Sequence, residues 1–186
     1  KTGIPYGDKT VYFEIPEENF IGLLDPPEIF PAEDPGQVLL DAIENPIGGK
    51  KLEEIVRPGK KIVVIADDGS RPTPVSLILP VLMKKLKECG AQQKDIKIVI
   101  ALGSHRYMTE DEIKDRVGEE IYDSYSVVNS EFKDPKELVY ICDSQEGAPL
   151  FATKSIMDAD IRIGVGNLVP HPVMGWGGGG KIIFPG

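Results

Sequence analysis

Three short runs of apolar, mostly β-branched residues, each followed by a polar loop, are the feature that most restricts the fold. The runs cover Lys61–Ala66, Ile96–Leu102 and Ile161–Val165. A continuous apolar run is typical of a strand buried on both faces, as in a parallel sheet covered by helices. After the first run the sequence predicts a helix over Val75–Glu88, with Gly90 as its stop signal. This alternation predicts right-handed βαβ units.

The whole pattern predicts the α/β class: a mostly parallel, Rossmann-like sheet with helices on both faces, preceded by a small N-terminal strand pair. The pair is expected at Val11–Ile15 and Phe20–Leu24. Thr109 and Glu112 form a capping box, which predicts a helix that ends at Gly118. The other expected elements are helices or helical turns at Gln37–Glu44, Leu52–Val56 and Ile156–Ala159, and strands at Tyr125–Asn129 and Leu138–Cys142.

Charge and composition argue against several classes of partner. The chain of 186 residues carries a formal net charge of −9, which argues against nucleic acid and anionic membranes. No run approaches the roughly 18 apolar residues of a membrane span, and no signal-peptide segment opens the chain. Cys89 and Cys142 are too few for a disulfide framework and too far apart for a CxxC site. We therefore expect a reducing, cytoplasmic location.

Polar clusters follow the three apolar runs directly. These clusters are Asp67–Arg71, Gly103–Arg106 and His171–Lys181. In an open α/β sheet, the loops at the carboxyl ends of the strands line one crevice, where ligands bind. We therefore expect the three clusters to converge on one ligand site.

His105 and His171 are the two histidines of the chain, and each lies in one of these clusters. Taken singly, either one could be a loop histidine without a chemical role. Together, two imidazoles that ionise near neutral pH suit a two-base reaction, in which one removes a proton and the other supplies one. A metal pair is another alternative, but no third His or Cys lies at ligand spacing, so a closed zinc site is not expected.

The first cluster is expected to lead into the N-terminus of a helix. Ser70, free backbone N–H groups and Arg71 at such an N-terminus would suit a phosphate or a carboxylate. The alternative is an ordinary N-cap with a solvated charge pair.

The glycine run before Lys181 has three interpretations. It matches the Gly-x4-Gly-Lys pattern of a P-loop, but Ile182 stands where Mg²⁺ binding needs Ser or Thr, and the preceding strand ends about ten residues too early. A flexible glycine linker is the second interpretation. The third is a close approach of the backbone to a ligand, with the Lys181 amine at the ligand's edge.

In this order and spacing, the three loops resemble the nickel-dependent lactate racemase family of 2-hydroxyacid racemases and epimerases. The matching segments are Ala66–Pro74 (ADDGSRPTP), Ala101–Thr109 (ALGSHRYMT) and the loop from His171 to Lys181, which continues as KIIFPG. The resemblance runs from about Ile15 to Gly186 and corresponds to the N-terminal part of such an enzyme.

The resemblance implies a cofactor, nickel(II) pyridinium-3,5-bisthiocarboxylate mononucleotide, attached covalently through Lys181. It implies that His105 and His171 act as alternating acid and base on opposite faces of the substrate, while hydride passes to the cofactor and returns to the other face. The family holds its cofactor with loop residues that correspond here to Asp68, Gly69, Ser70 and Arg71. A nickel-ligating histidine is expected downstream of Gly186, and no metal ligand is expected within this chain.

The implied function is a racemase or epimerase that inverts the carbinol carbon of a lactate-like 2-hydroxyacid by proton-coupled hydride transfer. Two other functions stay open: a P-loop-like nucleotide hydrolase, and a non-catalytic domain that binds a small anion or a cofactor.

We expect residues 1–186 to form a single α/β domain, the N-terminal part of a longer two-domain enzyme. Residues 1–59 would be an extension packed on a βαβ catalytic core over residues 60–186. The expected partners are a small 2-hydroxyacid and a C-terminal domain of the same protein. We expect residues 1–186 alone to be inactive.

Overall fold

The computed structural model describes residues 2–22, 24, 27 and 29–184. The chain divides into two compact units, Lys1–Glu33 and Asp34–Gly186. Residues 34–59 therefore belong to the same unit as the expected βαβ core. The expected packing of the residues before 34 on this core stays a prediction.

The first unit contains an antiparallel hairpin of β1 (Thr2–Tyr6) and β2 (Lys9–Phe13). Gly7 in the turn has φ = 57°, a left-handed conformation that glycine adopts without a Cβ clash. A short 3₁₀ helix, η1 (Glu17–Asn19), follows.

The predicted strand pair is wrong in position: the observed pair lies nearer the N-terminus. Residues 11–13 of its first member belong to β2, but residues 20–22 and 24 of its second member form no strand, and residue 23 lies outside the described residues. The true partner, β1, contains Gly3 and Pro5. Both residues are unfavourable in central strands and hide the strand pattern, but an isolated hairpin tolerates them because both of its strands are edges.

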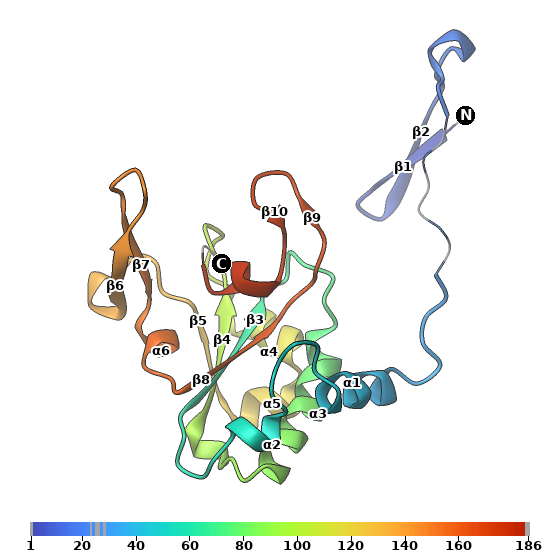
Figure 1. Ribbon diagram of the computed structural model, residues 1–186. Helices are drawn as coiled ribbons and strands as arrows, with labels where there is room; N and C mark the ends of the chain where they lie inside the picture. Colours follow the sequence, from blue (N-terminus) through green and yellow to red (C-terminus); the bar gives the residue numbers. More distant parts are fainter. Residues whose placement is uncertain (1, 23, 25–26, 28, 185–186) are drawn as a thin grey trace. The chain divides into compact units, whose positions relative to one another are not determined.

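The second unit is built on a parallel sheet in the order β5–β4–β3–β8 (Figure 1). Its strands are β3 (Ile62–Asp67), β4 (Ile96–Ala101), β5 (Ser126–Asn129) and β8 (Ile161–Val165). All six residues of β3 are buried, as expected for a strand with neighbours on both sides and helices over both faces. The predicted α/β class with a mostly parallel sheet is confirmed.

Helices lie on both faces of this sheet. They are α1 (Pro35–Glu44), α2 (Leu52–Ile55), α3 (Val75–Glu88), α4 (Glu110–Val117), α5 (Glu119–Ser124) and α6 (Lys154–Met157). On one face, apolar side chains of α3, α4 and α5 form the larger core with even-numbered strand residues such as Val64 and Ile98. On the other face, α6 and the 3₁₀ helix η4 (Gly179–Ile182) pack against odd-numbered residues such as Val63 and Ile65. The two-residue period of a strand divides the side chains between the two cores.

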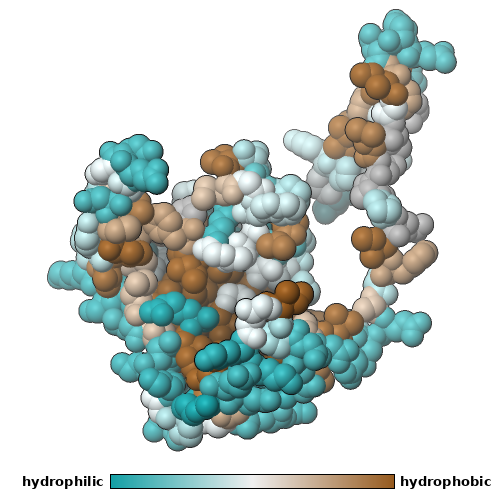
Figure 2. All heavy atoms as spheres, in the orientation of Figure 1, coloured by the Kyte–Doolittle hydropathy of each residue, from teal (hydrophilic) through white to brown (hydrophobic). Residues whose placement is uncertain are grey.

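Smaller elements complete the second unit. These are the 3₁₀ helices η2 (Gln93–Asp95) and η3 (Pro135–Glu137), the antiparallel pair β6 (Leu138–Asp143) and β7 (Pro149–Thr153), and the two-residue strands β9 (Pro170–His171) and β10 (Gly175–Trp176). Tyr140, Ile141 and Phe151 are exposed on the β6–β7 pair, and Figure 2 shows hydrophobic atoms on this part of the surface. Among the helices of the described residues, none has the length and apolar character needed to cross a membrane.

Candidate active site

The first, second and third loops, which follow β3, β4 and β8, meet at the carboxyl edge of the parallel sheet. They line one cavity of about 340 Å³. This confirms the prediction that the three sequence clusters converge. Five of the predicted site residues line this cavity, namely Asp68, Arg71, His105, His171 and Lys181. The other two, Gly69 and Ser70, line an adjoining cavity of about 590 Å³, which shares Asp68 and His105 with the first.

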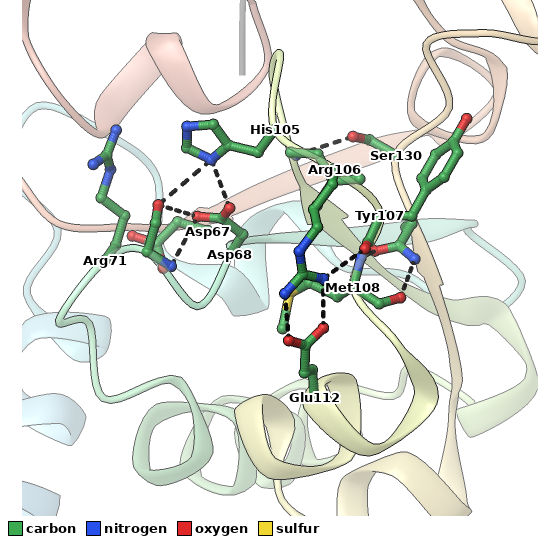
Figure 3. A network of polar contacts seen from close by, with 12 residues as sticks. Asp67, Asp68, Arg71, His105, Arg106, Tyr107, Met108, Glu112 and Ser130 are labelled. Atoms are coloured by element: carbon green, nitrogen blue, oxygen red, sulfur yellow. Dashed lines mark hydrogen bonds and ion pairs between the residues drawn. The ribbon is translucent and has the colours of Figure 1, made fainter.

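Asp68 joins the first loop to the second. Its carboxylate Oδ1 accepts hydrogen bonds from Ser70 Oγ at 2.6 Å and from Ser70 N–H at 3.2 Å. Its Oδ2 lies 2.7 Å from His105 Nδ1, and Figure 3 marks this contact with a dashed line. Burial raises the pKa of the Asp68 carboxyl, but the hydrogen bonds from Ser70 and His105 outweigh burial and leave the pKa below its usual value. An ionised carboxylate only accepts, so His105 Nδ1 carries the proton and Nε2 of the neutral ring is unprotonated.

The lowered pKa of Asp68 predicts how the stability of the fold depends on pH. A carboxyl whose pKa is lower in the folded state stabilises the fold above its unfolded pKa, about 3.9, and this contribution is lost as the pH falls through the folded pKa. The difference in unfolding free energy between the native chain and Asp68→Asn should therefore persist from neutral pH to about pH 4 and shrink below it. Urea unfolding at several pH values measures this difference. A difference that grows below about pH 4 would contradict a lowered pKa of Asp68 in the folded state.

His171 lies on the third loop, in β9, and is half-buried. Its Nδ1 accepts hydrogen bonds from the backbone N–H groups of Val173 at 3.2 Å and Met174 at 3.1 Å. Because Nδ1 is an acceptor, the proton of the neutral ring is on Nε2. The two histidines of the cavity are therefore held in opposite tautomers: His105 has an unprotonated Nε2, and His171 has a protonated one.

Arg71 and Lys181 bring positive charge to the cavity. Within the part of the chain that the structure describes, neither side chain donates a hydrogen bond or forms an ion pair. Figure 3 shows the Arg71 side chain extending beside the His105–Asp68 pair. Cations of this kind bind carboxylate or phosphate groups. The cavity can therefore hold an anion close to two imidazole rings.

The alternative interpretation of the first cluster, an ordinary N-cap, is wrong. Helix α3 begins at Val75, its N-cap is Pro74, and no side chain caps it. Ser70 instead bonds Asp68, and the N-terminus of α3 lines the adjoining cavity. The two prolines of the loop delay the start of the helix, because a residue that precedes proline is disfavoured in the helical conformation.

The glycine run before Lys181 does not have the geometry of a P-loop. The preceding strand is the two-residue β10, and the run leads into the 3₁₀ helix η4, whereas a P-loop joins a sheet strand to an α-helix. Ile182 is buried in the smaller core. The run instead passes close to the start of the third loop: a Cβ on Gly178 would lie 2.7 Å from the backbone oxygen of Asn167.

Two glycines of this run make a matched pair for mutagenesis. Gly178 has φ = 67° and the close contact with Asn167, whereas a Cβ on Gly180 would meet no atom within 4 Å. Gly178→Ala should lower the free energy of unfolding by at least about 1–2 kcal/mol, and Gly180→Ala should change it by no more than about 0.5 kcal/mol. Urea denaturation of both variants measures these changes. Equal effects would contradict the close packing of the loop.

The second loop is held by several contacts that no sequence pattern indicates. Tyr107 OH donates to Glu131 Oε1 at 2.5 Å, which raises the pKa of Tyr107 to about 12 and lowers the pKa of Glu131 to about 2. The Asn129 side chain donates to the Met108 carbonyl at 2.9 Å and accepts from its N–H at 3.3 Å. The capping box is confirmed, with Glu112 accepting from Thr109 N–H at 2.9 Å. These contacts fix the backbone just after His105.

Asn167 and Arg116 are two further residues of the site that the sequence did not indicate. Asn167 lines the cavity, and Arg116 binds the first loop from α4. A lone asparagine after a strand and a lone arginine in a charged helix have no sequence pattern that indicates such roles.

The chain matches a protein family described as the lactate racemase N-terminal domain over residues 6–186. It is 31% identical to a lactate racemase of Thermoanaerobacterium thermosaccharolyticum and 31% identical to a lactate racemase of Lactiplantibacillus plantarum. Each alignment covers 98% of this chain and 43% of the relative. The chain therefore spans less than half the length of these relatives.

Solved structures show the same likeness. The lactate racemase apoprotein from T. thermosaccharolyticum superimposes with a TM-score of 0.85 at 32% identity, covering 99% of this chain and 43% of the other. A protein from Thermotoga maritima superimposes with a TM-score of 0.64 at 23% identity, covering 81% of this chain and 38% of the other, and shares the fold.

Proposed function

The chain belongs to the family of lactate racemase N-terminal domains, and from this premise we propose that the full-length protein is a racemase or epimerase of a lactate-like 2-hydroxyacid. The observation that carries the proposal is the convergence of His105, His171, Arg71 and Lys181 on one cavity of about 340 Å³. Two imidazoles supply an acid and a base, and the cations attract an anion.

The residues of the cavity fit the nickel(II) pyridinium-3,5-bisthiocarboxylate mononucleotide that the family resemblance implies. Gly180 beside Lys181 faces open space, which leaves room for a planar group, and the unpaired Arg71 guanidinium suits a phosphate. We propose that Lys181 attaches the group covalently and that Ser70 acts by holding Asp68. When bound, the group supplies an acceptor and donor of hydride. We place its nickel-ligating histidine downstream of Gly186.

His105 is the proposed base for the substrate hydroxyl. Its Nε2 is unprotonated while Nδ1 donates to Asp68 at 2.7 Å. Once Nε2 has taken the hydroxyl proton, the ring is an imidazolium, and the Asp68 carboxylate stabilises that charge. Asp68 is 7% exposed, whereas 45% of the His105 side chain is exposed, so water screens this interaction mainly from the His105 side.

His171 is the proposed acid on the other side of the substrate. Transfer of its Nε2 proton from the neutral ring would leave an imidazolate, so Nδ1 must first be protonated. In the structure, Nδ1 instead accepts from the Val173 and Met174 N–H groups. We therefore propose that proton transfer at His171 is coupled to a change in the turn over residues 171–174. In this change Nδ1 loses the hydrogen bonds from the two amides and takes up a proton.

Apolar side chains complete the wall of the cavity and help to exclude water during the reaction. They belong to Ala101, Leu102, Val173, Met174 and Ile182.

The test is inversion of a single enantiomer by the full-length protein, expressed with the cofactor-synthesis enzymes and nickel. Lactate and malate are incubated separately, and chiral chromatography follows the product. Both enantiomers of a substrate should converge on the same mixture, and residues 1–186 alone should give no inversion. Retention of the cofactor without inversion would support a binding domain instead. Mg²⁺-dependent ATP turnover would support a nucleotide hydrolase.

A further inference from the structure

We infer that Arg116 is a positioning residue for the Asp68–His105 pair, acting through the backbone of the first loop. The inference deepens the proposed function, because this pair is the proposed base. Arg116 lies on α4 with 11% of its side chain exposed. It lines the adjoining 590 Å³ cavity but not the 340 Å³ cavity that holds both histidines. Its contacts with the first loop connect it to the 340 Å³ cavity.

The Arg116 guanidinium binds three backbone carbonyls of the first loop. Nε donates to the Asp67 carbonyl at 3.0 Å. Nη1 donates to the Arg71 carbonyl at 3.0 Å and to the Thr73 carbonyl at 2.9 Å. One rigid, planar group thus holds the beginning, the middle and the end of residues 67–73. A lysine has the charge but not the fork of donors needed to span them.

The same guanidinium forms a largely buried ion pair with the Asp67 carboxylate. The other carboxylate oxygen of Asp67 accepts from Thr73 Oγ1 at 2.5 Å and from Asn167 N–H at 3.2 Å. Asn167 belongs to the third loop, so the Arg116–Asp67 pair connects two of the three loops of the site to α4. Removing one member of such a pair leaves an uncompensated buried charge.

The position of Asp68 depends directly on this arrangement. Asp68 follows Asp67 in the chain, and its carbonyl accepts from Arg71 N–H at 3.2 Å within the same loop. His105 reaches the loop through its 2.7 Å contact with Asp68 and a 3.5 Å contact with Ser70. A loop displacement of about 1 Å would lengthen the Asp68–His105 contact beyond hydrogen-bond distance. His105 would then lose the partner that fixes its tautomer.

The experiment compares Arg116→Lys with Arg162→Lys in the 186-residue chain. Arg162 is the matched control because it also binds backbone carbonyls, those of Ile156 and Met157 on the other face of the sheet. The chain has two histidines, so the ring ¹⁵N NMR shifts of each can be assigned, and these shifts report which nitrogen carries the proton.

We expect Arg116→Lys to convert His105 from the Nδ1–H tautomer to a mixture of tautomers, and Arg162→Lys to leave its spectrum unchanged. In the full-length, cofactor-loaded protein, Arg116→Lys should lower kcat by about 10²-fold, with a smaller change in KM. The NMR result does not require racemase activity, so failure of the inference and failure of the proposed function are distinguishable.

A purely structural role would give a different outcome. Arg116→Lys would then lower the denaturation midpoint while the His105 ring shifts of the folded chain stayed those of the native protein, and this result would overturn the inference. If Arg116→Lys does not fold, Thr73→Ala removes one bond to Asp67 and keeps Arg116. We expect the ring ¹⁵N shifts of His105 to change in the same direction by a smaller amount. Unchanged ring shifts would equally overturn the inference.

Discussion

Replacing His105 or His171 by Ala is expected to lower racemisation by the full-length, cofactor-loaded protein by about 10²–10⁴-fold for each residue. Both histidines line the same cavity but lie on different loops. In the proposed reaction each ring transfers a proton on its own side of the substrate, and the other ring cannot replace it. Loss of either one should therefore stop inversion in both directions, as measured by chiral chromatography from each enantiomer.

Both histidine variants should keep the fold. His105 has 45% of its side chain exposed, and loop residues of this kind contribute little to core packing. Circular dichroism and urea unfolding are the controls. A folded His105→Ala or His171→Ala enzyme that retains native activity would remove that residue from the proposed acid–base pair.

Lys181 is expected to carry a covalent mass increment in the full-length protein expressed with the cofactor-synthesis enzymes and nickel. The adjacent glycines remove side chains that would block a planar group, and Gly180 has no neighbour within 4 Å of a built Cβ. Lys181→Arg and Lys181→Ala should both lose the increment and the activity, because guanidinium is a poor nucleophile and does not replace an amine. Intact-mass and peptide spectra measure the modification.

The arginine variant distinguishes the two roles of Lys181. A lysine that only supplies a point charge to a phosphate would be partly replaced by Arg. An unmodified and fully active Lys181→Arg protein would therefore refute covalent attachment. Lys154→Arg, an exposed lysine on α6, is the control and should keep both the increment and the activity.

The main strands and helices could be predicted from the sequence because their patterns are local. Apolar runs predict β3, β4 and β8, and Val75–Glu88 is a helix with the predicted bounds. The expected elements of the second unit all appear within about two residues of their predicted ends. Convergence of the three polar loops followed from the topology of a parallel sheet.

What the sequence could not show depends on contacts between distant segments. β9 and β10 have two residues each and owe their structure to pairing with each other. β7 begins at Pro149 and pairs with β6 across an irregular register. The Arg116–Asp67 pair joins residues 49 positions apart, and no spacing rule marks it. The opposite tautomers of His105 and His171 likewise come from their hydrogen-bond partners, which only the fold brings into place.

The fate of deuterium at C2 of a single 2-hydroxyacid enantiomer, lactate first, tests the proposed racemase most directly. The full-length, cofactor-loaded protein is incubated with the labelled enantiomer in ordinary water, and the inverted product is isolated and analysed by mass spectrometry. Hydride transfer and return predict that the inverted product keeps its deuterium. Inversion with loss of deuterium to the solvent would contradict hydride transfer, and no inversion by the loaded protein would contradict the proposed function.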